Sequence, residues 1–299
     1  MNNLRNADII KNIKKQRLSE VCALGTGGEA EIFIEPDTPE EFQEILVAAQ
    51  GNRVYILGGG SNVVFPDGLV EGVVLSTRAL KKIRWLEDSR VEVQAGYSLP
   101  KLFREVREHD LGGLEFAVGI PGTVGGAICG NAGAAGFGIC DLLEEVTTIE
   151  SDGNLRIWRK NDFAYSYRYC ELANDARIII SCVMRFREKS PDDDSMIKNF
   201  ADKRRNQPLE FRSAGCTFKN PESQSDKSAG KLLDECGCKG LGIGGAVVSG
   251  KHANFILNVA GASSADVFQL VRICRERVLS ETGISLEPEI KFVGFDDAP

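Results

Sequence analysis

Two glycine-rich segments without a charged residue are the first candidates for chemistry in this sequence. They are GIPGTVGGAICGNAGAAGFG at 119–138 and YILGGGSNVV at 55–64. Glycine has no Cβ, so its backbone can approach a ligand closely and present successive N–H groups, which favour an anion such as a phosphate. One such segment would equally fit tight turns beside a sheet edge. Two of them favour a large ligand with a pyrophosphate and extended flat parts.

Three other segments carry side chains that could act on such a ligand. Arg168 lies in DFAYSYRY at 162–169, a basic run occupies 198–205, and Cys216 lies in SAGCTFKNP at 213–221. Each also has an ordinary structural explanation. Arg168 could be a surface arginine stacked on tyrosines, the basic run a solvated helix face, and Cys216 a small buried residue in a turn.

Other familiar patterns are rejected. GTGGEA at 25–30 matches G-x-G-x-x-A, but the strand pattern EIFIEP follows it, whereas a dinucleotide-binding loop must open a helix. The chain has only two histidines, so we do not expect a zinc site and predict no bound metal. Nine cysteines without a secretory signal indicate reduced thiols, and the Cys236–Cys238 pair does not match a CxxC motif.

Strands and helices that must position these residues can be read from the sequence. A polar helix or arm is expected at 2–20, and the glycine-rich segment 119–138 is expected to be a packed loop because apolar residues interrupt its glycines. The strand 53–57 leads directly into Gly58, where open sheets tend to bind ligands. Further strands are predicted at 31–35, 70–76, 90–96, 145–151, 155–160, 177–187 and 286–294, and helices at 37–49, 99–109, 229–236 and 266–282.

Composition limits the class of protein. The chain has 299 residues and a formal net charge of −7, which disfavours binding to nucleic acid. No apolar run approaches the roughly 18 residues that a membrane helix needs, and the first residues lack the apolar core of a signal peptide. We therefore expect a cytoplasmic protein of two or three domains without a membrane partner.

The ordered set of motifs resembles the UDP-N-acetylenolpyruvoylglucosamine reductase (MurB) family, flavoenzymes of bacterial peptidoglycan synthesis. The resemblance covers roughly residues 20 to 295. The stretch of sequence between Arg168 and Cys216 is short and has no inserted tyrosine loop, so the chain resembles the compact type II subclass of the family. The motifs are YILGGGSN (55–62), GIPGTVGGAICGNAG (119–133), YRY (167–169), QP (207–208), SAGCTFKNP (213–221), AGKLL (229–233), KHANFILN (251–258) and LEPEIKFVG (286–294).

The resemblance implies an α+β fold with a two-lobed FAD-binding module of the vanillyl-alcohol-oxidase (PCMH) type and an α+β substrate-binding domain. The expected divisions are 1–75 for the first FAD lobe, 76–205 for the second, and 206–285 for the substrate domain. A C-terminal strand, 286–299, is expected to return to the second lobe. Non-covalent FAD is expected on Gly58, Gly59, Gly60, Ser61, Asn62, Gly119, Ile120, Pro121, Gly122, Thr123, Gly125, Gly126 and Ala127.

The implied reaction is the NADPH-dependent reduction of UDP-N-acetylglucosamine enolpyruvate to UDP-N-acetylmuramate. Its enolate-like intermediate needs positive charge or hydrogen-bond donors, and then a proton. The family pattern assigns charge stabilisation to Arg168, a carboxyl group to Glu289 and the proton donor to Cys216. Glu289 helps only when it is protonated or shares a proton. Substrate contacts are expected from Tyr167, Arg204, Arg205, Lys219 and Asn220.

Cys216 departs from the family, which usually has serine at this position. A thiol with a reference pKa of about 8.5 is mostly protonated at neutral pH, so it can donate a proton. Two alternatives stay open: another FAD-dependent oxidase or dehydrogenase of the same fold, and a catalytically silent flavin-binding protein. We expect a monomer whose partners are the UDP-sugar and NADPH.

Overall fold

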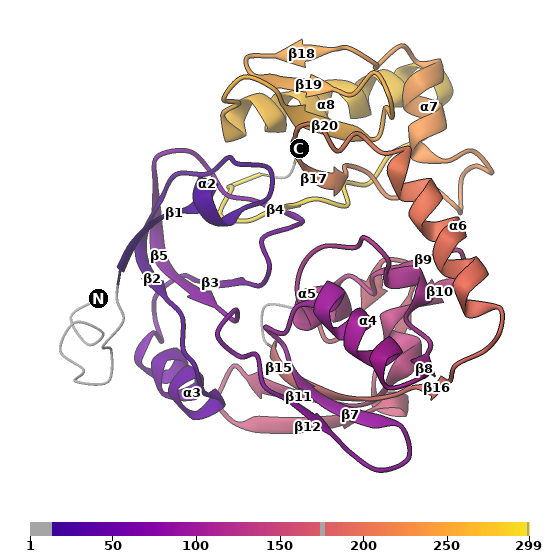
Figure 1. Cartoon of the computed structure of the whole chain (residues 1–299). Coiled ribbons are helices and arrows are strands. Elements are labelled where there is room, and N and C mark those ends of the chain that lie inside the picture. Colours follow the sequence, from indigo (N-terminus) through magenta and orange to yellow (C-terminus); the bar gives the residue numbers. More distant parts are fainter. Residues whose placement is uncertain (1–13, 174–176, 298) are drawn as a thin grey trace. The chain divides into compact units, whose positions relative to one another are not determined.

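The computed structural model describes residues 14–173, 177–297 and 299 (Figure 1). The chain divides into two compact units. Among the described residues, unit 1 contains 14, 32–59, 72–173 and 177–204, and unit 2 contains 15–31, 60–71, 205–297 and 299. The predicted three-part division into 1–75, 76–205 and 206–285 stays a prediction.

Unit 1 is built around a five-stranded antiparallel sheet of order β12-β11-β15-β7-β6. Two-stranded ladders join β10 to β9, β13 to β14, and β16 to β8. The elements of this unit are α3 (Pro39–Ala48), β3 (Val54–Leu57), β6 (Ile83–Trp85), β7 (Arg90–Gln94), α4 (Leu99–Glu108), β8 (Leu111–Gly112), η1 (Glu115–Ala117), α5 (Val124–Cys129), β9 (Gly133–Ala134), β10 (Phe137–Gly138), η2 (Ile139–Leu142), β11 (Leu143–Glu150), β12 (Leu155–Arg159), η3 (Lys160–Asp162), β13 (Tyr165–Ser166), β14 (Tyr169–Cys170), β15 (Arg177–Arg185) and β16 (Arg187–Glu188).

Unit 2 contains an antiparallel sheet of order β17-β20-β19-β18, along which α8 lies (Figure 1). Its elements are α2 (Leu18–Val21), β4 (Val63–Val64), β17 (Arg212–Cys216), α7 (Ala229–Glu235), β18 (Gly242–Ile243), β19 (Ala246–Val248), β20 (Phe255–Asn258), α8 (Ser264–Thr282) and β21 (Lys291–Phe292). Four elements cross from one unit to the other along the chain: β1 (Lys14–Arg17), β2 (Glu29–Ile34), β5 (Leu69–Ser76) and α6 (Asp193–Arg205).

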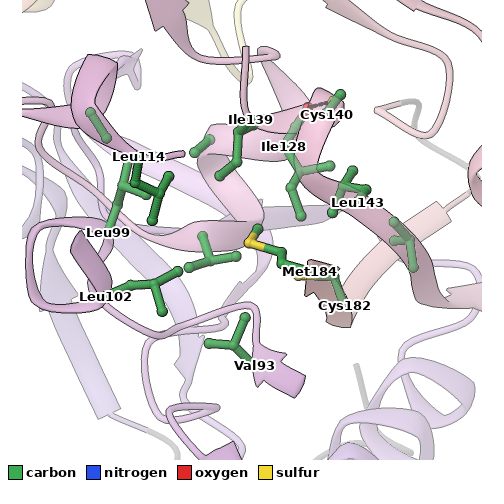
Figure 2. Packing of buried hydrophobic residues seen from close by; sticks show 14 of the residues in the cluster. Val93, Leu99, Leu102, Leu114, Ile128, Ile139, Cys140, Leu143, Cys182 and Met184 are labelled. Carbon is green, nitrogen blue, oxygen red and sulfur yellow. Dashed lines mark hydrogen bonds between the residues drawn. The ribbon is translucent and has the colours of Figure 1, made fainter. Parts of the chain in front are cut away.

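The hydrophobic core of unit 1 packs α4 and α5 against the five-stranded sheet. Figure 2 shows side chains of this cluster, including Leu102 of α4, Ile128 of α5 and Met184 of β15. These side chains have no exposed surface. Burial of this kind stabilises a fold by about 25 cal/mol for each Å² of apolar surface removed from water, so the core holds α4 and α5 against the sheet.

The predicted helices are confirmed where local end signals are strong. Ser98 accepts a hydrogen bond from the N–H of Lys101 at the start of α4. Ser263 and Asp266 form a capping box on α8, which ends at Gly283 with φ of 74°. Side-chain caps at the first turn and a left-handed glycine after the last are the usual helix boundaries.

Three structural expectations need correction. The stretch 119–138 is not a loop throughout, because it contains the short helix α5, whose first turn is capped by Thr123. Within 2–20, Lys14–Arg17 is a strand and Leu18–Val21 a helix, while residues 1–13 lie outside the described residues. Of the predicted strand 286–294, Lys291–Phe292 alone is a strand.

The C-terminal strand pairs differently from our expectation. We expected 286–299 to return to residues 76–205. In the structure, β21 pairs in parallel with β4, with Lys291 opposite Val63 and Phe292 opposite Val64. The same segment also packs with α8, because Phe292 and Phe295 contact the ring of Phe268.

Candidate functional site

The two glycine-rich segments meet within unit 1. Gly58 and Gly59 follow β3, and Gly122 and Thr123 precede α5. A Cβ on Gly59 would lie 2.6 Å from Cα of Gly122, and a Cβ on Gly58 would lie 3.0 Å from Oγ1 of Thr123. Real side chains do not tolerate the first distance, so the close approach of the two backbones depends on glycine at position 59.

The N–H groups at this meeting point divide into two sets. In the first turn of α5, Val124 donates to the carbonyl of Tyr97 at 2.9 Å and Gly125 to that of Ala95 at 2.8 Å. Gly126 donates to Thr123 Oγ1 at 3.4 Å. Among residues 14–173, 177–297 and 299, however, the N–H groups of Gly59 and Gly122 donate to no protein acceptor. An uncharged, glycine-lined surface with unused N–H groups fits the pyrophosphate of a dinucleotide such as FAD.

Arg78 holds the first of these loops and was missed by the sequence analysis. Its Nε donates to the carbonyl of Gly58 at 3.1 Å and its Nη2 to that of Gly59 at 2.9 Å. Arg78 follows β5, which pairs in parallel with β3 so that Leu57 is opposite Ser76. The only local signal is an arginine two residues beyond a predicted strand. Its partners become visible only once that strand pairing is known.

Arg168 occupies the tight turn between β13 and β14, with a left-handed φ of 53°. Its guanidinium carbon lies 5.1 Å from the ring centroid of Tyr167, as expected for a stacked arginine. Its Nη1 also donates to the carbonyl of Gly133 at 3.2 Å. The structure therefore brings the YRY motif to the glycine-rich segment 119–138 within one unit.

Asn131 fixes the hairpin that carries Arg168. The Asn131 side chain, 8% exposed, donates to the carbonyl of Ser166 at 2.8 Å and accepts from the N–H of Cys140 at 3.1 Å. A buried amide that satisfies a donor and an acceptor on two segments rigidifies both.

The structure also places other predicted cofactor and substrate residues of unit 1. Ile120 packs against the hydrophobic core and donates its N–H to the carbonyl of Ala117. Pro121 is exposed and Ala127 is buried in α5. The stem of Arg204 lies on Gly119, whose Cβ would be 3.2 Å from Cγ of Arg204.

In unit 2, Cys216 and Glu289 lie on directly hydrogen-bonded segments. The N–H of Glu289 donates to the carbonyl of Thr217, next to Cys216, at 2.7 Å. A bridge between Phe218 and Pro288 continues this pairing. Both side chains are half-buried. The fold therefore places the backbone of Glu289 next to that of Cys216, although the two residues are 73 positions apart in the sequence.

Asn62 joins this arrangement through its side chain. Its Nδ2 donates to the carbonyl of Glu289 at 2.9 Å, and its own carbonyl accepts from the N–H of Lys291 at 3.0 Å. The preceding Gly60 accepts from the N–H of Ala23 at 2.8 Å, and Ser61 lies between them, half-buried. The predicted cofactor residue Asn62 therefore also supports the segment that carries Glu289.

The predicted substrate residues of unit 2 already contact protein groups. Lys219 forms an ion pair with Glu287 at 2.6 Å. The Oδ1 of Asn220 accepts from the N–H of Ala229 at the start of α7, at 3.0 Å. The carbonyl of Arg205 accepts from Lys251 Nζ at 3.0 Å. A phosphate at Lys219 must therefore compete with the exposed carboxylate of Glu287.

Arg212 is a structural residue in unit 2. Its guanidinium donates to the carbonyls of Ser19, Cys22 and Ala23, at 3.2, 2.9 and 3.1 Å. These carbonyls lie in and just after α2. The planar guanidinium of Arg212 therefore ties the end of α2 to β17.

A metal site is not formed by the residues that the structure describes, where no group of three or more His, Cys, Asp or Glu side chains is placed to hold an ion. GTGGEA leads into β2 rather than a helix, which confirms the rejection of a dinucleotide fingerprint there. In the described part of the chain, no helix has both the length and the apolar character needed to cross a membrane.

Comparison with known proteins first defines the class. Residues 30–158 match the family model described as "FAD binding domain", so the glycine-lined surface of unit 1 lies within an FAD-binding domain. This match, together with the mixture of helices and strands and the structural likeness given below, confirms the predicted α+β fold with an FAD-binding module.

Residues 207–293 match the model described as "UDP-N-acetylenolpyruvoylglucosamine reductase, C-terminal domain". The chain is 37% identical over 278 residues to the reductase of that name from Geotalea uraniireducens, covering 92% of this chain and 91% of that one. It is 36% identical over 301 residues to the one from Listeria monocytogenes, covering 99% and 100%. The crystal structure of MurB from Thermus caldophilus is similar, with a TM-score of 0.80 and 32% identity over 94% of this chain and 98% of that one. The chain belongs to the UDP-N-acetylenolpyruvoylglucosamine reductase family.

Proposed function

We propose that this protein reduces UDP-N-acetylglucosamine enolpyruvate to UDP-N-acetylmuramate with NADPH, a step in the synthesis of peptidoglycan precursors. The observation that carries this proposal is the Glu289–Thr217 hydrogen bond, which sets a carboxyl-bearing segment directly beside Cys216. Family membership supplies the substrate, because the relatives are named for it. Bound FAD would supply the hydride relay between NADPH and the enolpyruvyl double bond.

The chain's own residues would hold FAD without a covalent bond. The proposed contacts are the N–H groups of Gly59 and Gly122, beside Gly58, Gly60, Ser61, Asn62, Gly119, Ile120, Pro121, Thr123, Gly125, Gly126 and Ala127. Because Gly125, Gly126, Ile120 and Ala127 donate their N–H groups within the protein, their contribution would be shape. A surface without side chains lets a flat cofactor approach the backbone.

Three side chains would act on the enolpyruvyl group. Arg168 would stabilise the negative charge that develops on its carboxylate side, as fixed donors do in other enzymes. Glu289 would act in a protonated or proton-sharing form, because a second full negative charge would oppose the intermediate. Cys216 would then give its thiol proton to the carbon next to the one that receives hydride.

The UDP part of the substrate would be held by Tyr167, Lys219, Asn220 and one of Arg204 and Arg205. The Asn220 side chain is already oriented by its bond from Ala229. Lys219 would exchange the Glu287 carboxylate for a phosphate oxygen, and Arg can engage a phosphate with two parallel hydrogen bonds. We further propose that the protein works as a cytoplasmic monomer, without nucleic acid or membrane.

Separate measurement of the two half-reactions tests the donor role of Cys216. In stopped-flow experiments without oxygen, Cys216→Ala should be reduced by NADPH at a rate within about twofold of the unmodified protein. Its reoxidation by the UDP-enolpyruvyl sugar should slow by about 10²–10⁴-fold, the usual contribution of a positioned proton donor. Cys216→Ser should restore most of the second step. Normal reoxidation of the alanine variant would refute the assignment.

A further inference from the structure

Cys216 lies at the end of an irregular strand. Between Ser213 and Cys216 the strand β17 advances three residues, whereas its partner β20 advances two, from Leu257 to Phe255. The extra residue forms a β-bulge that includes Gly215, with φ of 80°. A bulge re-aims the side chains that follow it, so the direction of the Cys216 thiol depends on this bulge being held in place.

Asn254 holds the backbone immediately after the bulge. Its Oδ1 accepts from the N–H of Phe218 at 2.9 Å, and its Nδ2 donates to the carbonyl of the same residue at 2.8 Å. Its backbone carbonyl accepts from the N–H of Thr217 at 2.8 Å. Asn254 is 3% exposed, so water cannot readily replace these three bonds.

The other side of the same backbone carries Glu289. The carbonyl of Thr217 accepts from the N–H of Glu289, and Lys219 donates its N–H to the carbonyl of Glu287 at 2.9 Å. The segment 217–219 is therefore fixed by Asn254 on one edge and by 287–289 on the other. Release of one edge would loosen both Cys216 and Glu289.

We propose that Asn254 is a positioning residue for the proton-transfer step: its side-chain amide keeps the bulge in register, so that Cys216 and Glu289 stay aligned. The inference rests on the proposed role of Cys216 and extends it to a residue that touches neither substrate nor cofactor. The side chain replaces backbone pairing at the point where the ladder of β17 and β20 ends.

Asn254→Ala and a matched control test this role. Asn258 lies in the same strand and also holds backbone with its amide, donating to Leu24 at 3.0 Å and accepting from Ala262 at 2.8 Å. In the FAD-loaded full chain, Asn254→Ala should slow reoxidation by the UDP-enolpyruvyl sugar about 100-fold, the effect of a displacement of about 1 Å. Reduction by NADPH should stay within about twofold. Asn258→Ala should leave both steps within about threefold.

A second readout does not depend on catalysis. The rate at which iodoacetamide alkylates Cys216, followed by mass spectrometry of its peptide, should rise about tenfold or more in Asn254→Ala, because loss of the buried bonds favours local opening. Asn258→Ala should leave that rate within about twofold. An unchanged alkylation rate, or equal slowing of both half-reactions in the two variants, would overturn the positioning role.

Asn254→Asp distinguishes positioning from general stability. An aspartate keeps the acceptor for Phe218 but, when ionised, places a negative charge against the carbonyl of that residue. Its protonation at lower pH restores the donor, so reoxidation relative to the unmodified protein should recover as the pH falls. If the ratio of the reoxidation rates of Asn254→Asp and the unmodified protein stayed constant across pH, the proposal would be contradicted. If Cys216→Ala reoxidises normally while Asn254→Ala still alters alkylation, the donor assignment fails and the structural coupling stands.

Discussion

The backbones of Gly59 and Gly122 approach each other so closely that a Cβ on the first would lie 2.6 Å from Cα of the second. The two residues come from segments 63 positions apart, and both have N–H groups that no protein acceptor uses in the described part of the chain. This pair of glycines makes the uncharged surface on which the proposed FAD site depends.

Gly59→Ala tests that surface. The added methyl group forces the loops apart, and overpacking of this kind costs about 1–3 kcal/mol, so FAD affinity should fall about tenfold or more. Flavin content after purification and fluorescence titration with FAD measure this directly. Gly130→Ala is the control from the same glycine-rich segment, since its nearest neighbour would be 4.0 Å away. Equal FAD affinities for the two variants would argue against the site.

Arg78→Ala should weaken FAD binding without removing any predicted contact to FAD. Loss of two charged hydrogen bonds to Gly58 and Gly59 frees the loop, and we expect about a tenfold increase in the dissociation constant. Arg78→Lys should show an intermediate value, because an ammonium group cannot reproduce the planar fork. Isothermal titration with FAD gives all three constants. An alanine variant with unchanged affinity would show that Arg78 does not hold the loop.

Arg212→Ala should destabilise the fold rather than the chemistry. The variant loses hydrogen bonds to three carbonyls around α2, and because the side chain is exposed we expect a loss of about 1–2 kcal/mol in the free energy of unfolding. Arg272→Ala is the control. It removes an exposed ion pair with Glu276 on α8 and should change the free energy of unfolding by less than about 0.5 kcal/mol. Urea unfolding measures the free energy of unfolding of both variants. Similar losses in the two variants would contradict the structural role of Arg212.

His252 should make stability depend on pH. Burial lowers the pKa of its imidazole, and its Nδ1 accepts the N–H of Asn254 at 3.2 Å. The unfolded chain therefore takes up the proton first, so the histidine's stability contribution is present above about pH 6.5 and is lost as the pH falls below that value. The unmodified protein should lose more stability between pH 7.5 and 5.5 than His252→Gln. Equal losses of stability in the two proteins would mean that the pKa of His252 does not differ between the folded and the unfolded chain.

Local sequence signals predicted the helices whose ends carry capping residues. The helices predicted at 99–109 and 266–282 are α4 (Leu99–Glu108) and α8 (Ser264–Thr282), and their caps at Ser98, Ser263 and Gly283 lie within a few residues of the helix ends. The helix α5 was not predicted, because its six residues contain two glycines, which disfavour helices. It forms because Thr123 caps it and because the carbonyls of Tyr97 and Ala95, just after β7, accept its first N–H groups.

Residues whose partners come from distant segments could not be assigned in this way. Arg78 and Arg212 bind carbonyls 19 and 190 positions away, and Asn254 binds a residue 36 positions away. No spacing in the sequence encodes such contacts. Cys216 and Glu289 were paired by resemblance to a family, and the hydrogen bond beside them is what the fold adds.

The most direct test of the account is a visible spectrum of the purified protein without oxygen, recorded before and after NADPH and then after the UDP-enolpyruvyl sugar. We predict flavin bands that bleach with NADPH and return when the sugar is added. Bands that bleach but return only in air would indicate an oxidase or another acceptor. A protein without flavin, even after incubation with FAD, would contradict the glycine-lined FAD site itself.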